Sequence, residues 1–322
     1  MQHYTMIQWL FFFYFYCFAG WCFESAYVSV KARKLTNRGF MRGPFLPIYG
    51  SGAIMMLIVS MPFRDSIPLT YLAGCVGATV LEYVTGVTME ALFQVRYWDY
   101  SNVKFNFQGH ICLGSTLAWG VLTIVMTNIV HIRVEKLVLS IPGQILTVVT
   151  LLLTAGIFAD FALSFKAAID LRNVLLKMEQ AKAEMQRIQK RLDVIIAVSG
   201  EELTNRKEAI GESVNSAKQT LAESVTNLTE SMSELVSGIE GKLERIKTMA
   251  VTKPSEYLEG MKEEILELRT KYKTNLEHHN RLSSLTDFFQ RDLIRSNPGM
   301  TSVKFKESLE ELKAKVSGKK KK

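Results

Sequence analysis

The chain has 322 residues, a mean hydropathy just above zero and a formal net charge of +8. Its charge is unevenly divided: residues 1–165 hold 10 Lys/Arg and 7 Asp/Glu, and residues 166–322 hold the other 29 and 24. Neither half is basic enough to indicate a nucleic-acid-binding protein, so no nucleic-acid partner is expected. The first half is instead apolar enough to predict a membrane domain.

Residues 1–165 contain apolar stretches of about the 20 residues that a roughly 30 Å hydrocarbon core requires. We predict transmembrane spans at about 6–29, 44–62, 69–93, 110–131 and 139–163. Charged residues and prolines separate the spans, and the last break is expected at Arg133 and Lys136. The sequence therefore predicts an all-α, polytopic membrane protein with about five transmembrane helices.

Positive charges indicate how these spans are oriented. The loop after the first span carries basic residues and no acidic ones: Lys31, Arg33, Lys34, Arg38 and Arg42. Because basic loops stay in the cytoplasm, we expect a multi-pass protein of the cell membrane with its N-terminus outside and its C-terminus cytoplasmic. No basic residue precedes the first apolar run, so a cleaved signal peptide is not expected.

Three glutamates, Glu24, Glu82 and Glu90, lie inside or at the ends of the apolar stretches. A carboxylate in hydrocarbon costs about 2.5–3.5 kcal/mol on insertion scales, so each must be paired, face a wet cavity or serve a function. Glu24 lies near the first loop, where Arg38 or Arg42 could pair with it. Glu82 lies deeper and is the glutamate that we most expect to be functional.

The loops after the first and third spans mix glycines, aromatic residues and hydrogen-bonding side chains. Such segments can fold against polar residues of the spans, although an interfacial aromatic belt explains Trp98 equally well. His110 is interpreted as a helix-start residue rather than a proton carrier. The candidate polar site comprises these residues and the glutamates: Glu24, Arg38, Glu82, Glu90, Trp98, Asp99, Asn106 and Cys112.

These loops and spans carry a resemblance to a known family. The matching strings are Gly20-Trp21, Glu24-Ser25, Asn37-Arg38-Gly39-Phe40, Gly43-Pro44, Pro47-Ile48-Tyr49-Gly50, Leu81-Glu82-Tyr83, Thr85-Gly86, Glu90, Trp98-Asp99-Tyr100-Ser101, Phe105-Asn106, Gly109, Ile111-Cys112-Leu113 and Trp119-Gly120. Residues 20–131 thereby resemble the "putative ABC-transporter permease" family of bacterial membrane proteins, labelled CmpB or type IV. The chain departs from the family pattern at Lys104 and Gln108. The resemblance implies a permease, and the chain lacks the G-x-x-x-x-G-K-[ST] motif of an ATPase. ATP hydrolysis would then come from a separate nucleotide-binding subunit.

The second half changes character after residue 165. A three-four spacing of apolar residues predicts a helical seam: Leu171, Val174, Met178, Ala181, Met185, Ile188, Leu192 and Ile195. We expect a cytoplasmic coiled coil over 166–253 that pairs with a second copy or with a neighbouring helix, which makes a homo-oligomer the expected state.

Within the predicted coiled coil, apolar residues recur every 11 residues at Ile210, Leu221, Met232 and Leu243. This 11-residue repeat favours a straighter coiled coil or helical bundle over a membrane-surface helix. Residues 254–322 are expected to form a helical C-terminal region that begins near Pro254. An apolar patch in this region predicts a docking face: Leu282, Leu285, Phe288, Phe289, Leu293 and Ile294. The chain ends in the basic tail Lys319 to Lys322, interpreted as solvated or in contact with acidic lipid headgroups.

Three functional hypotheses remain open at this level. The first is a permease-like protein of an ABC-type transport system, surrounded by membrane lipids. The second is a membrane-anchored coiled-coil scaffold that recruits cytoplasmic partners. The third is an intramembrane lipid-modifying enzyme, which is disfavoured because no nucleophile–base pair or metal-ligand spacing occurs. No cofactor or metal is expected, and the cysteine spacing fits neither a zinc site nor a disulfide framework.

Overall fold

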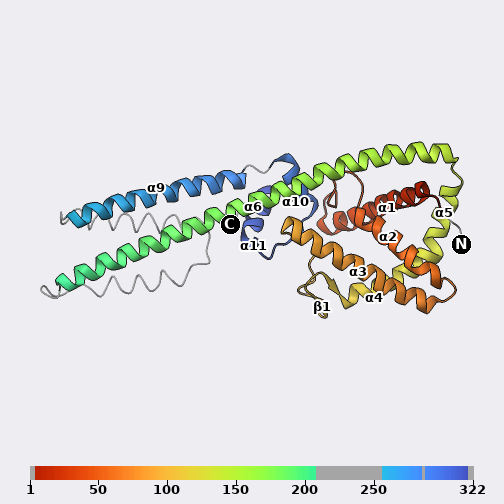
Figure 1. The fold of residues 1–322 in the computed structure, drawn as a ribbon, viewed down its shortest axis with the longest axis horizontal. Helices are drawn as coiled ribbons and strands as arrows, with labels where there is room; N and C mark the ends of the chain where they lie inside the picture. Colours follow the sequence, from red (N-terminus) through yellow and green to blue (C-terminus); the bar gives the residue numbers. More distant parts are fainter. Residues whose placement is uncertain (1–3, 208–255, 285–286, 318–322) are drawn as a thin grey trace. The chain divides into compact units, whose positions relative to one another are not determined.

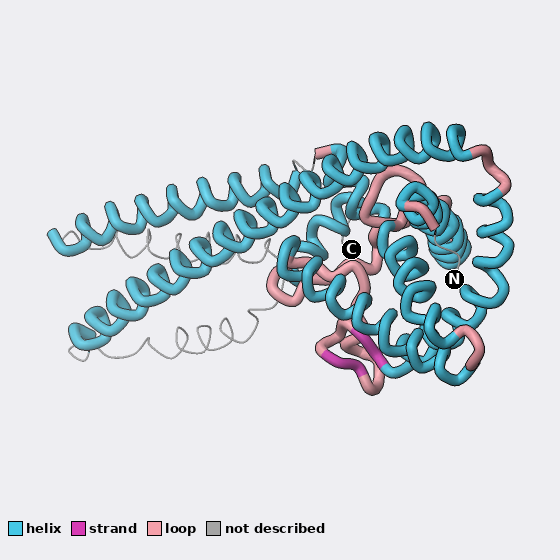
Figure 2. The backbone as a smooth tube through the Cα atoms, turned by 45° about the vertical axis from the view of Figure 1, so that its right-hand side comes forward, coloured by secondary structure: helices cyan, strands magenta, loops and turns pink. Residues whose placement is uncertain are grey.

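A computed structural model of the chain describes residues 4–207, 256–284 and 287–317, which are mostly helical (Figures 1 and 2). The helices are α1 (Met6–Ala32), α2 (Pro47–Ser60), η1 (Met61–Phe63), α3 (Ile67–Phe93), α4 (Leu113–Val125), the π-helical η2 (Met126–Val130), α5 (His131–Leu139), α6 (Gly143–Lys207), α9 (Glu256–Ser284), α10 (Phe288–Ser296) and α11 (Lys306–Val316). Two short antiparallel strands are also present, β1 (Asn106–Phe107) and β2 (Ile111–Cys112). The all-α prediction is therefore confirmed.

The chain divides into two compact units. Unit 1 comprises Met1–Leu176 and Ser283–Lys322, and unit 2 comprises Lys177–Leu282. The chain thus leaves unit 1 along α6, forms unit 2 and returns.

Unit 1 contains the apolar helices. Within the described residues, four helical segments are long and apolar enough to cross a membrane: Met6–Lys31, Ile67–Phe93, Leu113–Leu139 and Gly143–Ile195. The second predicted span differs, because α2 has only 14 residues and rises about 21 Å at 1.5 Å per residue. With η1 it forms a shorter apolar helix, Pro47–Phe63. Figure 1 shows α2 running between α1 and α3 and antiparallel to both.

The short α2 begins beside the middle of α1. The backbone N–H of Leu46 donates to the carbonyl oxygen of Cys17 at 3.0 Å, so the chain before α2 reaches half-way along α1. We call residues 33–46 loop one. Loop one satisfies its backbone from within the protein, as irregular backbone at membrane depth requires: Gly43 N–H donates to the Asp160 carboxylate at 2.8 Å. The chain therefore enters α2 through irregular backbone that is hydrogen-bonded to α1 and α6.

Small residues let α3 and α4 approach closely. A Cβ placed on Gly74 of α3 would lie 2.2 Å from the Oγ1 atom of Thr123 in α4. In contrast, a Cβ on Gly52 of α2 would meet no atom within 4 Å. Gly74 therefore has a packing function that Gly52 lacks.

The break expected at Arg133 and Lys136 is wrong, because both residues lie within α5. The helix continues from α4 through the π-helical turn η2 into α5, and it ends at Ser140, shortly before Pro142. No glycine or proline interrupts residues 121–139, so nothing in the local sequence ends the helix earlier.

Unit 2 contains the helical pair that the apolar seam predicts. Met185, Ile188, Leu192 and Ile195 of α6 form a buried cluster with residues of α9 that include Ile265 and Tyr272. Arg191 and Glu264 add an ion pair of 2.8 Å between these helices. Every predicted seam residue except Val174 is buried, and Leu175 is buried next to it. The partner for this part of the seam is a neighbouring helix of the same chain.

Several expectations lie outside the described residues. These are the 11-residue repeat that begins at Ile210, the break at Pro254 and the basic tail from Lys319 to Lys322.

Candidate polar site

Glu82 lies at the centre of a neutral hydrogen-bonded cluster between α3 and α4. Its side chain accepts from the Tyr100 hydroxyl at 3.1 Å, the Ser115 hydroxyl at 3.2 Å and the Trp119 indole N–H at 2.9 Å. The residue is 6% exposed. Among the described residues, no Lys, Arg or His forms an ion pair with it. The carboxylate is therefore held by preorganised neutral donors rather than by a countercharge.

Glu90, two turns further along α3, has a different environment. Its carboxylate lies 2.8 Å from Arg96 Nε and 3.1 Å from His110 Nε2. His110 is buried and lies outside α4, which Cys112 caps through its sulfur and the Ser115 N–H at 3.3 Å. The interpretation of His110 as a helix-start residue is therefore wrong, because its ring faces Glu90. Glu90 is a paired carboxylate.

Asp99 lies on the far side of Arg96 from Glu90, in residues 94–112, which we call loop three. It is 3.5 Å from Arg96 Nη1 and accepts from the Thr301 hydroxyl at 3.0 Å. Burial alone would raise the pKa of Asp99, but hydrogen bonds from Ser101 and Thr301 and the charge of Arg96 outweigh it and lower that pKa below its ordinary value. Asp99 is therefore ionised at neutral pH.

Loop one positions the third glutamate. Glu24 accepts from the Tyr49 hydroxyl at 2.8 Å and lies 3.9 Å from Arg38 Nε. The expected pairing of Glu24 with a loop-one arginine is thus present. Arg38 also donates to Asn297 Oδ1 at 3.0 Å and to the carbonyl oxygen of Tyr97 at 3.4 Å, so one guanidinium connects loop one, loop three and the C-terminal region.

The remaining predicted residues hold loop three in shape. The Trp98 indole N–H donates to the carbonyl oxygen of His110 at 2.9 Å. Asn106 donates to the carbonyl oxygens of Ser101 and Val103 and accepts from Gly109 N–H, beside the β1–β2 hairpin that Figure 2 shows in magenta. Cys112 is buried and caps α4. These contacts support the site and expose no reactive group.

The predicted residues therefore fall into separate clusters rather than one. Glu82 has its own neutral cluster, Glu90 and Asp99 share Arg96, and Glu24 pairs with Arg38. Sequence reasoning missed Asp160, the carboxylate in the last apolar run that accepts from Gly43 N–H. The signal was present, since Asp160 is the one acidic residue between Lys136 and Lys166.

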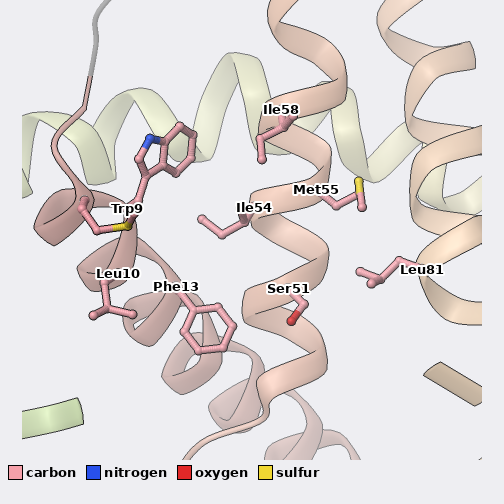
Figure 3. Close-up of a pocket in the computed structure, with 9 residues that line it drawn as sticks. Trp9, Leu10, Phe13, Ser51, Ile54, Met55, Ile58 and Leu81 are labelled. Carbon is pink, nitrogen blue, oxygen red and sulfur yellow. The ribbon is translucent and has the colours of Figure 1, made fainter. Parts of the chain in front are cut away.

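An apolar groove of about 360 Å³ lies elsewhere, between α1 and α2, and Figure 3 shows its lining. Trp9, Phe13 and Ile54 line it, with Ser51 as the polar exception and Leu81 on the α3 side. None of the candidate polar residues lines this groove. In the described part of the chain, no group of three or more His, Cys, Asp or Glu residues is arranged to hold a metal ion.

The apolar helices with a polar site at one end define an all-α, polytopic membrane protein. Residues 11–165 match the family model described as "Putative ABC-transporter type IV", so this part of the chain is similar to that family. The match covers every predicted site residue and ends before the seam of α6. No curated protein and no solved structure matches the chain.

Proposed function

We propose that residues 1–165 form the membrane-spanning permease component of an ABC-type transport system, with ATP hydrolysis supplied by a separate nucleotide-binding subunit. The family match supports a transport role, and the sequence has no nucleotide-binding motif of its own. In this proposal the N-terminus is outside, and loops one and three face the cytoplasm, where the nucleotide-binding subunit would bind.

The observation that carries the proposal is the environment of Glu82. Glu24 and Glu90 are paired with Arg38 and Arg96, so their burial is accounted for by ion pairs. Glu82 has no such partner among the described residues, and neutral donors alone hold it. A carboxylate kept in a helical membrane domain without a countercharge marks a polar or cationic group that arrives during function.

The experiment is to purify the full chain with its nucleotide-binding partner and to measure ATP hydrolysis in lipid for three forms. Glu82→Gln removes the charge but keeps the shape, and we expect it to abolish or uncouple hydrolysis. Glu135→Gln is the matched control, because it makes the same change in α5 at the opposite end of the helices. Equal hydrolysis by wild type and both variants would contradict a functional role for Glu82.

A second candidate function is a membrane-anchored scaffold, which unit 2 favours. Its two helices pack through a buried apolar cluster and form a compact unit of their own. Under this hypothesis, unit 2 binds cytoplasmic partners, and disrupting its cluster with Leu192→Asp abolishes function while Glu82→Gln does not. Pairing of the chain with a second copy remains part of this proposal, and a size measurement in detergent tests it.

A further inference from the structure

The C-terminal residues 287–317 of unit 1 lie against both loops of the candidate site, and we call them the clasp. The clasp contains α10, a turn and α11, and it lies outside residues 11–165, the region that matches the family model. Met300 is 0% exposed and Phe305 is 1% exposed, so the turn between the helices is anchored by apolar burial. The polar contacts described next surround these anchors.

The clasp binds loop one through Arg38 and Gly39. Arg38 donates to Asn297 Oδ1 at 3.0 Å and to the carbonyl oxygen of Ser296 at 3.3 Å. The Asn297 amide in turn donates to the carbonyl oxygen of Gly39 at 2.8 Å. Asn297 is 1% exposed. The buried Asn297 side chain therefore hydrogen-bonds to both a guanidinium group and a backbone carbonyl group of loop one.

Arg42 makes the second contact with loop one. Its Nε atom lies 3.5 Å from Asp292 Oδ2, and its guanidinium lies 4.4 Å from the ring centre of Phe289 and 5.2 Å from that of Phe288. A guanidinium over aromatic faces is attracted by the ring quadrupole. Two residues of the patch predicted as a docking face, Phe288 and Phe289, thus contact Arg42, and Leu285 of that patch lies outside the described residues.

Loop three is held by Thr301 and Ser302 of the clasp. The backbone N–H and carbonyl groups of Arg96 and Thr301 exchange hydrogen bonds of 2.7 and 2.9 Å. The Thr301 hydroxyl donates to Asp99, and the Ser302 hydroxyl donates to the carbonyl oxygen of Gln94 at 2.7 Å. The clasp therefore connects loop one to loop three.

The clasp has the properties of a segment that docks reversibly. Helices α10 and α11 have 9 and 11 residues, and neither has a side-chain N-cap hydrogen bond. Helices this short are marginal in isolation, so their order depends on docking. Apart from Asp292, the clasp gives Arg38 and Arg42 neutral acceptors. A carboxylate would bind these guanidinium groups more strongly than the neutral oxygens do.

We propose that the clasp is a reversible occupant of a docking surface formed by Arg38 and Arg42, and that an acidic segment of the nucleotide-binding subunit competes with it for these arginines. The competition rests on the proposed function, whereas the docking of the clasp does not. When the clasp is docked, loops one and three are fixed to each other and the arginines are covered. When it is released, both arginines are open to the partner.

Docking is tested by cleavage of the full chain with a protease that cuts after lysine, because Lys304 and Lys306 lie in the clasp. Arg42→Glu and Asp292→Arg each place like charges together and add no cleavage site. We expect each to speed cleavage at these lysines about fivefold, since like charges at a contact oppose binding. The double variant restores the pair, so its cleavage slows again. Arg187→Glu is the control, because its ion pair with Glu184 lies within unit 2.

Cleavage rates that do not differ among these forms would overturn the docking, as would a double variant that is cut as fast as either single variant. Competition is then tested by purifying the tagged chain in mild detergent and measuring how much of the nucleotide-binding ATPase is recovered with it. Asp292→Arg releases the clasp and keeps both arginines, so recovery should rise about fivefold relative to wild type. Unchanged recovery overturns the competition. An ATPase missing from every form overturns the proposed function and the competition together, and it leaves the cleavage result standing.

Discussion

Two substitutions at Glu82 can distinguish a functional carboxylate from a structural one. Its carboxylate accepts hydrogen bonds from the partly buried side chains of Tyr100, Ser115 and Trp119. Glu82→Leu leaves the Tyr100 and Trp119 donors without this acceptor, at about 1–3 kcal/mol each, whereas the Ser115 hydroxyl keeps the carbonyl oxygen of Cys112 at 2.9 Å. Glu82→Gln keeps an amide oxygen for Ser115 and Trp119, and its amide N–H can donate to Tyr100, whose hydroxyl also accepts.

The two substitutions therefore have different expected costs. Glu82→Leu should destabilise the protein by about 3 kcal/mol or more, whereas Glu82→Gln should cost about 1 kcal/mol, because neutral hydrogen bonds replace charge-assisted ones. For a domain of this size, each kcal/mol lowers the melting temperature by about 2–4 °C. The assay is the loss of the monodisperse size-exclusion peak after heating in detergent.

We expect a loss of about 6–12 °C for Glu82→Leu and less than about 4 °C for Glu82→Gln. Equal losses for both substitutions would refute the reasoning, because they would show that the fold needs the charge itself. In that case Glu82 would be a structural group, and a loss of transport in Glu82→Gln would carry no information about mechanism.

Further predictions concern the clasp, the helix packing and unit 2. The folded-state pKa of Asp99 lies below its ordinary value of 3.8. The contribution of the ionised Asp99 to clasp docking is therefore complete above pH 3.8. It is lost as the pH falls through the lower folded-state pKa. Pepsin cleavage of the clasp should therefore accelerate in that acidic range, and Thr301→Val should reduce the pH dependence. Gly74→Ala should cost about 1–3 kcal/mol of stability by overpacking, whereas Gly52→Ala, whose Cβ would meet no atom within 4 Å, should stabilise α2 by up to about 1 kcal/mol, as melting in detergent will show. Leu192→Ala should destabilise the α6–α9 pair by about 2–5 kcal/mol, which hydrogen exchange within unit 2 measures; unchanged exchange would contradict the packing.

Much of the fold follows from local sequence. The apolar stretches predict the long helices because a span needs about 20 apolar residues whatever surrounds it. The seam from Leu171 to Ile195 predicts a buried helical stripe, and its residues are buried apart from Val174. The seam does not identify its partner, because an apolar face fits a second copy or α9 equally well.

Other features depend on contacts between distant residues. Glu24 pairs with Arg38, 14 positions away, and this pairing follows from the adjacent loop. Asn297 binds Arg38 and Thr301 binds Asp99 across more than 200 positions, and no local pattern places these segments together. The start of α2 at Pro47 likewise depends on Cys17 and Asp160 accepting backbone N–H groups of loop one.

The positive charges of Arg133 and Lys136 illustrate a different limit. Arg133 and Lys136 suggest a loop, because charges disfavour a membrane interior. They lie instead in the final turns of a continuous helix, and Arg133 donates to the carbonyl oxygen of Ile129 on its own helix at 2.9 Å. A charge near the end of a span marks the membrane boundary and does not end the helix.

The most direct test of the account is whether the tagged full-length chain co-purifies with a nucleotide-binding ATPase from mild detergent. The proposed permease function predicts such a subunit in stoichiometric amount, recovered from membranes without crosslinking. A homo-oligomer that carries soluble partners and no ATPase would contradict that function and would support the scaffold.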